Sequence, residues 1–191
     1  MDCVRAAAHT AEGDPSAAWV ASVVASLGRM ATYLPEAGQR ALWRRTPDTF
    51  IACGLVASGT ATEEGDGWRV RGVWQYVSGI HFSDWALVAC PVPAGDDGHE
   101  VRFLLLPRSA YTVEDSWFTV GMRATGSDSL RIDDAFVPKE YSFHAARCWP
   151  ARPRGRAPHL RRPAARRERT DVRGSGARRG RAGRCEPSGP T

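Results

Sequence analysis

Residues 67–92, GWRVRGVWQYVSGIHFSDWALVACPV, decide the fold. Apolar, aromatic and β-branched side chains fill two runs, and Gly72 interrupts the first, where we expect a bulge or bend. Turn signals rich in Gly, Asp and Pro separate these runs from similar ones on either side. The complete set of candidate strands is 50–57, 67–78, 84–92, 101–107, 111–117 and 129–137. Short strands at this spacing predict an antiparallel sandwich or small barrel, not βαβ units.

A helical region precedes the candidate strands, and its strongest signals lie in residues 14–34. Asp14 can accept hydrogen bonds from the free N–H groups of a first helical turn, and Pro15 suits the first helical position. Apolar residues then recur at helical spacing, and Trp19 widens the apolar stripe that should pack on the strands. Further helical segments are expected at 2–11 and 35–45.

Composition divides the chain sharply near residue 147. Residues 1–147 carry 13 basic and 18 acidic side chains, net −5, whereas residues 148–191 carry 13 arginines, no lysine and 3 acids, net +10. The overall charge of +5 therefore comes entirely from the last segment. We predict an α+β chain with three parts, the last of them disordered because it contains few large apolar residues. They are a partial N-terminal helical domain at 1–48, a middle antiparallel β-domain at 49–143 and a tail at 144–191.

The arginine-rich tail has three interpretations. It can be a basic arm that binds nucleic acid or an acidic partner, although aromatic residues do not interleave with its arginines. It can be a regulatory linker, although nothing foldable follows it. We favour an out-of-frame extension, because GC-rich codons read in the wrong frame yield mainly Arg, Pro, Ala and Gly. Nucleic acid is therefore not the expected partner.

Cysteine usage and hydropathy exclude several classes of protein. The five cysteines form no CxxC pair and no His lies at zinc-finger spacing, so we expect free thiols and no metal site. The longest apolar runs are far shorter than the roughly 18 to 20 residues that span a bilayer. Acidic residues stand where a signal peptide would be apolar. We expect a cytoplasmic protein without a membrane partner.

Several segments, taken in order, link the chain to a known family. They are SAAWVAS at 16–22, GTA at 59–61, WQYVSG at 74–79, HFSDW at 81–85, WFTVGMRATGS at 117–127 and IDDAFVP at 132–138. Their order and spacing resemble the acyl-CoA dehydrogenase superfamily. The branch they resemble most is that of the flavin-dependent two-component monooxygenases, which hydroxylate aromatic or polyketide substrates. The resemblance runs from Trp19 to Tyr141.

The resemblance implies a plan of three parts. An N-terminal helical domain and a middle β-domain precede a C-terminal four-helix bundle, which covers the flavin, supplies the catalytic base and builds a homotetramer. This chain matches the end of the first part and all of the second, so we expect truncation at both ends and no bundle. Weak flavin binding, little or no turnover and no tetramer follow as expectations. The end of the resemblance near Phe143 also favours an out-of-frame tail.

The resemblance assigns flavin contacts first to residues 76–79. Tyr76 takes the place of an aromatic residue against the flavin ring, and Ser78 that of a hydroxyl that reaches the reactive ring nitrogen and donates a hydrogen bond there. Val77 and Gly79 would line the wall and allow close approach. On the residues alone, Tyr76 and Ser78 are simply two positions on one face of an ordinary strand.

Two further assignments concern loops. Gly59 and Thr60 correspond to a small-residue loop whose backbone approaches the flavin, and the residues alone also fit a plain turn. His81 follows the flavin segment closely, so it is a candidate catalytic group that moves a proton near a flavin or a phenolic substrate. A histidine on a surface loop is the competing interpretation.

We therefore predict a fragment of a flavin-dependent oxidoreductase. The resemblance implies FMN or FAD as the cofactor, a small-molecule substrate and a flavin reductase as partner. Two alternatives stay open: the remnant of an acyl-CoA dehydrogenase proper, and a non-catalytic β-domain with a basic nucleic-acid-binding tail.

Overall fold

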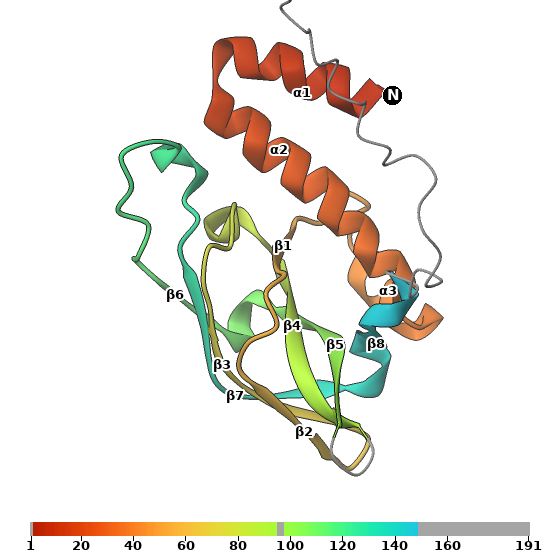
Figure 1. Ribbon diagram of the computed structural model, residues 1–191. Helices are drawn as coiled ribbons and strands as arrows, with labels where there is room; N and C mark the ends of the chain where they lie inside the picture. The colour runs from red at the N-terminus through yellow and green to blue at the C-terminus, as the bar shows by residue number, and fades with distance from the viewer. Residues whose placement is uncertain (1, 95–97, 149–191) are drawn as a thin grey trace, which may run out of the picture. The chain divides into compact units, whose positions relative to one another are not determined.

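The computed structural model describes residues 2–94 and 98–148 (Figure 1). The α-helices are α1 (Asp2–Gly13), α2 (Pro15–Gly28) and α3 (Glu36–Trp43). The strands are β1 (Ile51–Gly54), β2 (Thr60–Glu64), β3 (Gly67–Trp74), β4 (Trp85–Ala94), β5 (Gly98–Pro107), β6 (Thr112–Glu114), β7 (Ser129–Pro138) and β8 (Ser142–His144). Short 3₁₀ helices are η1 (Arg29–Tyr33), η2 (Ile80–Phe82), η3 (Arg108–Ala110), η4 (Arg123–Thr125), η5 (Lys139–Tyr141) and η6 (Ala145–Arg147). Residues 144–148 of the predicted tail form the end of β8, η6 and Cys148, whereas the rest of the tail predicted to be disordered or out of frame, from 149 onward, lies outside the described residues.

Helix α2 begins where the sequence predicts. The Asp14 side chain accepts hydrogen bonds from the backbone N–H groups of Ser16 at 2.7 Å and Ala17 at 3.0 Å, and Pro15 is the first helical residue. A cap of this kind stabilises a helix by about 1 kcal/mol. The α-helix ends at Gly28, and the chain continues as η1 through the rest of the predicted 14–34 segment.

The strands form two four-stranded sheets, in the orders β1-β4-β5-β8 and β2-β3-β7-β6. In the described part of the chain, neighbouring strands are antiparallel except for β1 and β4, which run parallel from Ile51 beside Trp85 to Gly54 beside Val88. The predicted antiparallel β-domain therefore contains one parallel pair. Strands β2 and β3 and the 3₁₀ segment η2 lie between β1 and β4 and provide the crossover that a parallel pair requires. The α+β class is confirmed.

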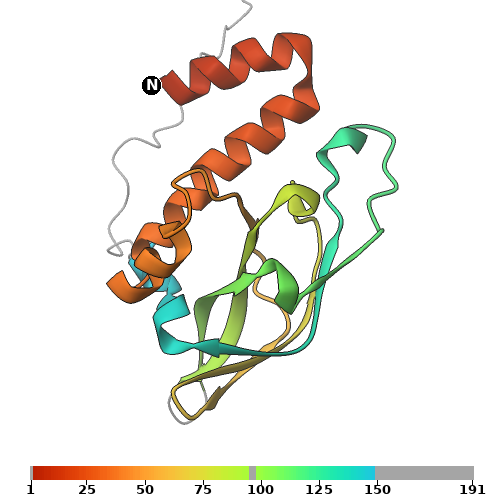
Figure 2. The same ribbon diagram turned by 180° about the vertical axis from the view of Figure 1, so that it is seen from behind.

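Strand β4 separates two apolar cores, because its side chains alternate between the two faces of its sheet. Ala86 and Val88 face the core between the sheets, whereas Leu87 and Ala89 face a second core that the N-terminal helices cover. Burial on both faces explains why β4 reads as a continuous apolar run instead of an alternating one. Figures 1 and 2 show the hairpin of α1 and α2 lying over one end of the strands.

Strand β3 is shorter than the sequence predicts. It ends at Trp74, not at residue 78, and its pairing with β7 shifts register between Val70 and Gly72, where a bulge was expected. Tyr76 then turns the chain sharply, with φ at 63°. The two strands that sequence analysis missed, β2 and β8, are short, and β2 is polar with mostly exposed side chains.

Candidate functional site

A groove opens beside the end of β3, between helix α2 and the loop that joins β6 to β7. Its volume is about 400 Å³, in the range that small-molecule sites occupy. The lining residues are Trp19, Tyr76, Ser78, Trp117, Thr119, Gly121, Met122, Thr125 and Ser127. Figure 2 shows the β6–β7 loop standing beside α2, as the contacts between α2 and η4 require. Most of the groove wall is aromatic or apolar, and the hydroxyl groups supply its polar part.

Backbone strain is concentrated in this groove. Among residues 2–94 and 98–148, the non-glycine residues with positive φ are Tyr76 at 63° and Met122 at 57°, and both line the groove. A bulky residue in the left-handed region costs about 1 to 3 kcal/mol and persists where the surroundings hold it. The Tyr76 ring, 66% exposed, meets the Trp117 ring edge-to-face with centroids 5.8 Å apart. Strain kept at two lining residues favours a binding role for the groove.

A line of hydroxyl groups forms the polar side of the groove. The indole Nε1 of Trp19 donates to the Ser78 Oγ at 3.0 Å. The Ser78 Oγ lies 2.9 Å from the Ser127 Oγ, which lies 2.7 Å from the Thr125 Oγ1. The three hydroxyl residues are at most 8% exposed, so their hydrogen-bonding groups are held in place by the protein.

Asp128 anchors the loop that carries Trp117 and the hydroxyl residues. Its Oδ1 accepts hydrogen bonds from the backbone N–H groups of Ser116 at 2.7 Å and Trp117 at 2.8 Å, and its Oδ2 lies 2.6 Å from the His81 Nε2. Burial alone would raise the pKa of Asp128, but the hydrogen bonds from His81 and the two backbone groups outweigh burial and hold that pKa below its usual value. The carboxylate therefore stays ionised where it organises the loop.

His81 does not line the groove. Its ring is half exposed, and its Nε2 contacts the Asp128 carboxylate, which is itself not among the residues that line the groove. His81 therefore contacts the carboxylate that anchors the loop and helps to position it. The catalytic role of His81 stays a prediction.

The other predicted residues fall into two groups. Tyr76 and Ser78 line the groove, but an irregular segment carries them, with Ser78 buried while Tyr76 is exposed. The expectation of one strand face is wrong because β3 has already ended. Val77, which lies between these two residues, is fully buried in the core between the sheets. Gly79, which follows Ser78, packs under α2, where an added Cβ would lie 3.1 Å from a methyl group of Val20.

Gly59 and Thr60 lie outside the groove. Gly59 has φ at 64°, and a Cβ there would lie 2.6 Å from the Arg71 carbonyl oxygen and 2.7 Å from the Trp74 ring. The turn and the close approach to Trp74 therefore explain this glycine without a ligand. A flavin contact at Gly59 and Thr60 stays a prediction.

Sequence reasoning missed four important groove residues. Trp19 fits the apolar helical stripe by spacing, yet it is 50% exposed and turns its N–H toward Ser78. Met122, Thr125 and Ser127 lie in a segment that the family resemblance singles out, but nothing in their spacing marks the hydroxyl groups as neighbours of Ser78. The available signal was a tryptophan, whose indole N–H needs a hydrogen-bond partner, in a helix expected to pack on strands.

The described residues contain free thiols and no clustered metal ligands. Cys3, Cys53, Cys90 and Cys148 are free, and burial raises the pKa of Cys53 and of Cys90 to about 12. Within residues 2–94 and 98–148, no three His, Cys, Asp or Glu side chains are grouped as a metal ion would require. In the same part of the chain, no helix has both the length and the apolar character needed to cross a membrane.

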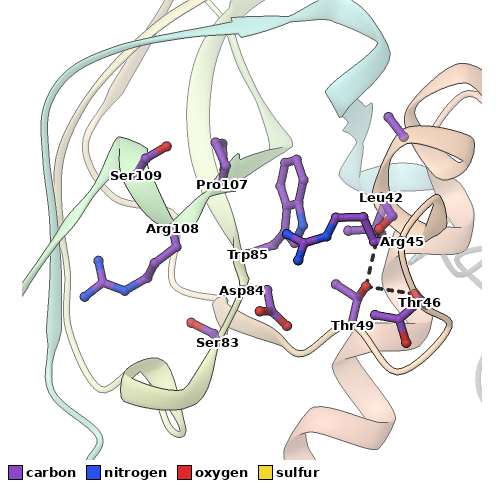
Figure 3. Close-up of a pocket in the computed structure, with 11 residues that line it drawn as sticks. Leu42, Arg45, Thr46, Thr49, Ser83, Asp84, Trp85, Pro107, Arg108 and Ser109 are labelled. Carbon is purple, nitrogen blue, oxygen red and sulfur yellow. Dashed lines mark hydrogen bonds between the residues drawn. The ribbon is translucent and has the colours of Figure 1, made fainter.

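A second pocket lies between α3 and the start of β4 (Figure 3). Arg45 lies beside Trp85 on the α3 side, whereas the Arg108 guanidinium points away and donates to the Tyr111 carbonyl oxygen at 3.0 Å. Asp84 uses its carboxylate to accept a hydrogen bond from the Phe50 N–H at 3.0 Å. Its lining includes none of the predicted site residues. The lining of this pocket includes both basic and acidic side chains, which favour no single class of ligand.

The sequence and the fold of the chain are similar to those of proteins of known structure. No model of a protein family matches the sequence. Among solved structures, XiaF from Streptomyces sp. in complex with FADH2 and glycerol matches with a TM-score of 0.65 and 34% identity, over 70% of this chain and 34% of that chain. The HsaA monooxygenase from Mycobacterium tuberculosis matches with a TM-score of 0.64 and 30% identity, over 68% of this chain and 34% of that chain. The chain is a relative of the acyl-CoA dehydrogenase-like flavin-dependent monooxygenases.

Curated members of this group agree with the structural matches. The oxygenase component of FADH(2)-dependent resorcinol hydroxylase from Rhizobium sp. (strain MTP-10005) is 37% identical over 126 residues, 65% of this chain and 31% of the relative. Indole-3-acetate monooxygenase from Pseudomonas putida is 34% identical over 130 residues, 68% of this chain and 33% of the relative. The chain thus spans about a third of the length of these flavin-dependent monooxygenases.

Proposed function

We propose that the groove beside Ser78 binds a reduced flavin. The chain would then be the flavin-binding part of an oxygenase that hydroxylates an aromatic or polyketide substrate, with the reduced flavin delivered by a separate reductase. The observation that carries the proposal is that Tyr76 and Ser78, which the family resemblance selects as flavin contacts, line one groove. The FADH2 bound to a relative with 34% identity supports it.

The residues present fit a flavin ring. Trp19, Tyr76 and Trp117 offer apolar faces to an aromatic ligand, and Ser78 offers a hydroxyl oxygen held at the groove wall. Bound reduced flavin would supply the electrons for oxygen activation. The residues of this chain would orient the ring, exclude water from its faces and hold its polar edge.

The length of the chain limits what we expect from it. A segment that spans a third of its relatives provides one wall of the site, so we expect flavin binding in the micromolar range or weaker and little or no hydroxylation. FAD is the first cofactor to test because the matched relatives are named with FADH2, and FMN is the second. A cytoplasmic location remains part of the proposal.

An anaerobic titration of the full 191-residue chain with reduced FAD and reduced FMN tests the proposal. We expect saturable quenching of tryptophan fluorescence, and about five- to tenfold weaker binding for Ser78→Ala, since one hydrogen bond contributes about 1 to 1.4 kcal/mol. Ser109→Ala, in the second pocket, is the matched control and should bind like the wild type.

Three results would argue against the proposal. They are failure of the wild type to bind either reduced flavin, equal affinity for Ser78→Ala and wild type, and weaker binding for Ser109→Ala alone. Hydroxylation of resorcinol when reduced flavin and oxygen are supplied would contradict only the expected lack of turnover.

A further inference from the structure

Met122 exposes a thioether in the groove. Its side chain lines the groove wall and is 39% exposed, whereas Met30 is 7% exposed in the core that the helices cover. The third methionine of the chain, Met1, lies outside the described residues. Of the two methionines that the structure describes, Met122 is therefore the one that a small solute can reach. Because a thioether sulfur is soft and can be oxidised, exposure decides which of the two reacts.

Three hydrogen bonds hold the Met122 backbone in place. Its carbonyl oxygen accepts from the Trp117 Nε1 at 3.0 Å, the Thr125 N–H at 3.1 Å and the Thr125 Oγ1 at 2.8 Å. These donors lie on both sides of Met122 in the chain, and they hold its backbone in the left-handed region at φ 57°. Turning the thioether into the core would break these hydrogen bonds, so the side chain stays at the groove.

The reaction of this thioether with hydrogen peroxide needs no further reactant. One peroxide oxygen bonds to the sulfur as the O–O bond breaks, the thioether loses two electrons and becomes a sulfoxide, and the other oxygen leaves as water. Molecular oxygen that takes two hydrogens from reduced flavin becomes hydrogen peroxide and leaves oxidised flavin. A groove that binds reduced flavin in air therefore receives the oxidant at the place where Met122 lies.

We propose that Met122 is an oxidation site: hydrogen peroxide converts its thioether to the sulfoxide, and the oxidised groove binds reduced flavin more weakly. The second part of this inference rests on the proposed flavin function of the groove. The sulfoxide replaces a flexible apolar group by a polar one, which a flavin ring packed on the wall would strip of water. We expect binding to weaken about fivefold. Methionine sulfoxide reductases for both sulfoxide epimers should restore it.

Peptide mass spectrometry of the full chain after treatment with hydrogen peroxide tests the first part. In the folded protein, Met122 should form sulfoxide at least about tenfold faster than Met30, because Met30 is buried and reacts only when the fold opens. In urea, the two rates should agree within about twofold, since unfolding exposes both side chains. Equal or reversed rates in the folded chain, or a difference that persists in urea, would overturn the oxidation site.

The dissociation constant for anaerobically reduced FAD, measured before and after peroxide treatment, tests the second part. Catalase removes the peroxide before each titration. Met122→Leu is the matched variant, because leucine keeps an apolar side chain of similar size and cannot form a sulfoxide. Each protein is compared with itself, so the starting affinity of the variant does not enter. The wild type should lose about fivefold in affinity and regain it after reductase treatment, whereas Met122→Leu should show no change on treatment.

The outcomes separate this inference from the proposed function. An equal loss in wild type and Met122→Leu assigns the loss to another group and overturns the second part, as do unchanged or tighter binding by the oxidised wild type and its unfolding, seen by circular dichroism. Failure of the untreated wild type to bind reduced flavin overturns the proposed function, while mass spectrometry still decides the oxidation site. If Met122→Leu fails to fold, recovery of wild-type binding by the reductases decides, since these enzymes act on methionine sulfoxide.

Discussion

Tyr76 combines an unfavourable backbone conformation with an exposed aromatic ring. Its backbone lies in the left-handed region at φ 63°, and its ring is 66% exposed. An aromatic ring contributes to the stability of a fold mainly when it is buried, and this ring stays in solvent. Neither feature therefore stabilises the fold. The compensation is the ring's position opposite Trp117 in the groove.

Replacement of Tyr76 separates stability from binding. Tyr76→Asn should be at least as stable as the wild type, because Asn tolerates positive φ, while Tyr76→Ala should be less stable than Tyr76→Asn by about 0.5 to 1 kcal/mol. Both variants should bind reduced flavin more weakly. Urea unfolding gives the order of stabilities. A Tyr76→Asn variant clearly less stable than Tyr76→Ala would show that the ring, not the strain, dominates at this position.

At the scale of elements, the β6–β7 loop is held to the β-domain by the buried carboxylate of Asp128. Backbone N–H groups of Ser116 and Trp117 point at one carboxylate oxygen, and His81 lies on the other. The loop in turn carries Thr125 and Ser127 to Ser78. The organisation of the groove therefore depends on the charge of one side chain.

Acid should release this loop. Because the folded-state pKa of Asp128 lies below its unfolded value, its contribution to stability is complete above about pH 4 and is lost as the pH falls through the lower, folded-state value. Asp128→Asn should lose about 1 to 3 kcal/mol at pH 6 and show a shallower decline of unfolding free energy between about pH 4 and pH 2. Urea unfolding of both proteins across this range measures the difference. Parallel declines would mean that Asp128 does not stabilise the folded state through its charge.

The elements differ in how well the sequence predicts them. The helix start at Asp14 and the strands β4, β5 and β7 follow from local capping and long apolar runs. The parallel pairing of β1 with β4 depends on contacts between distant segments, which periodicity does not report. The early end of β3 depends on Tyr76 adopting a conformation that its residue type disfavours.

The candidate site is predicted in the same uneven way. Resemblance selects Tyr76 and Ser78, and both line the groove. Trp19 joins them only because α2 packs beside the end of β3, so its indole reaches a serine 59 positions later in the chain. Contacts across such separations come from tertiary packing, and a spacing rule within one element cannot anticipate them.

At the scale of the whole molecule, the described residues form a groove between α2 and the β6–β7 loop and leave aromatic side chains exposed on that loop and on η2. Phe118 is 80% exposed on the β6–β7 loop, and Phe82 is 72% exposed in η2. The chain spans about a third of its relatives, so these surfaces agree with a site that one segment only begins to enclose. We therefore expect reduced flavin to bind in the groove, but to bind weakly.

The location of bound flavin tests this account most directly. In a ¹H–¹⁵N spectrum of the full chain, anaerobic addition of reduced FAD should shift the indole N–H resonances of Trp19 and Trp117, which line the groove. The resonance of Trp74, whose N–H is bonded to the Ala89 carbonyl inside the fold, should stay in place. Trp19→Phe and Trp117→Phe assign the two signals. Shifts at Trp74 without shifts at Trp19 and Trp117, or no shifts at saturating flavin, would contradict a flavin site in the groove.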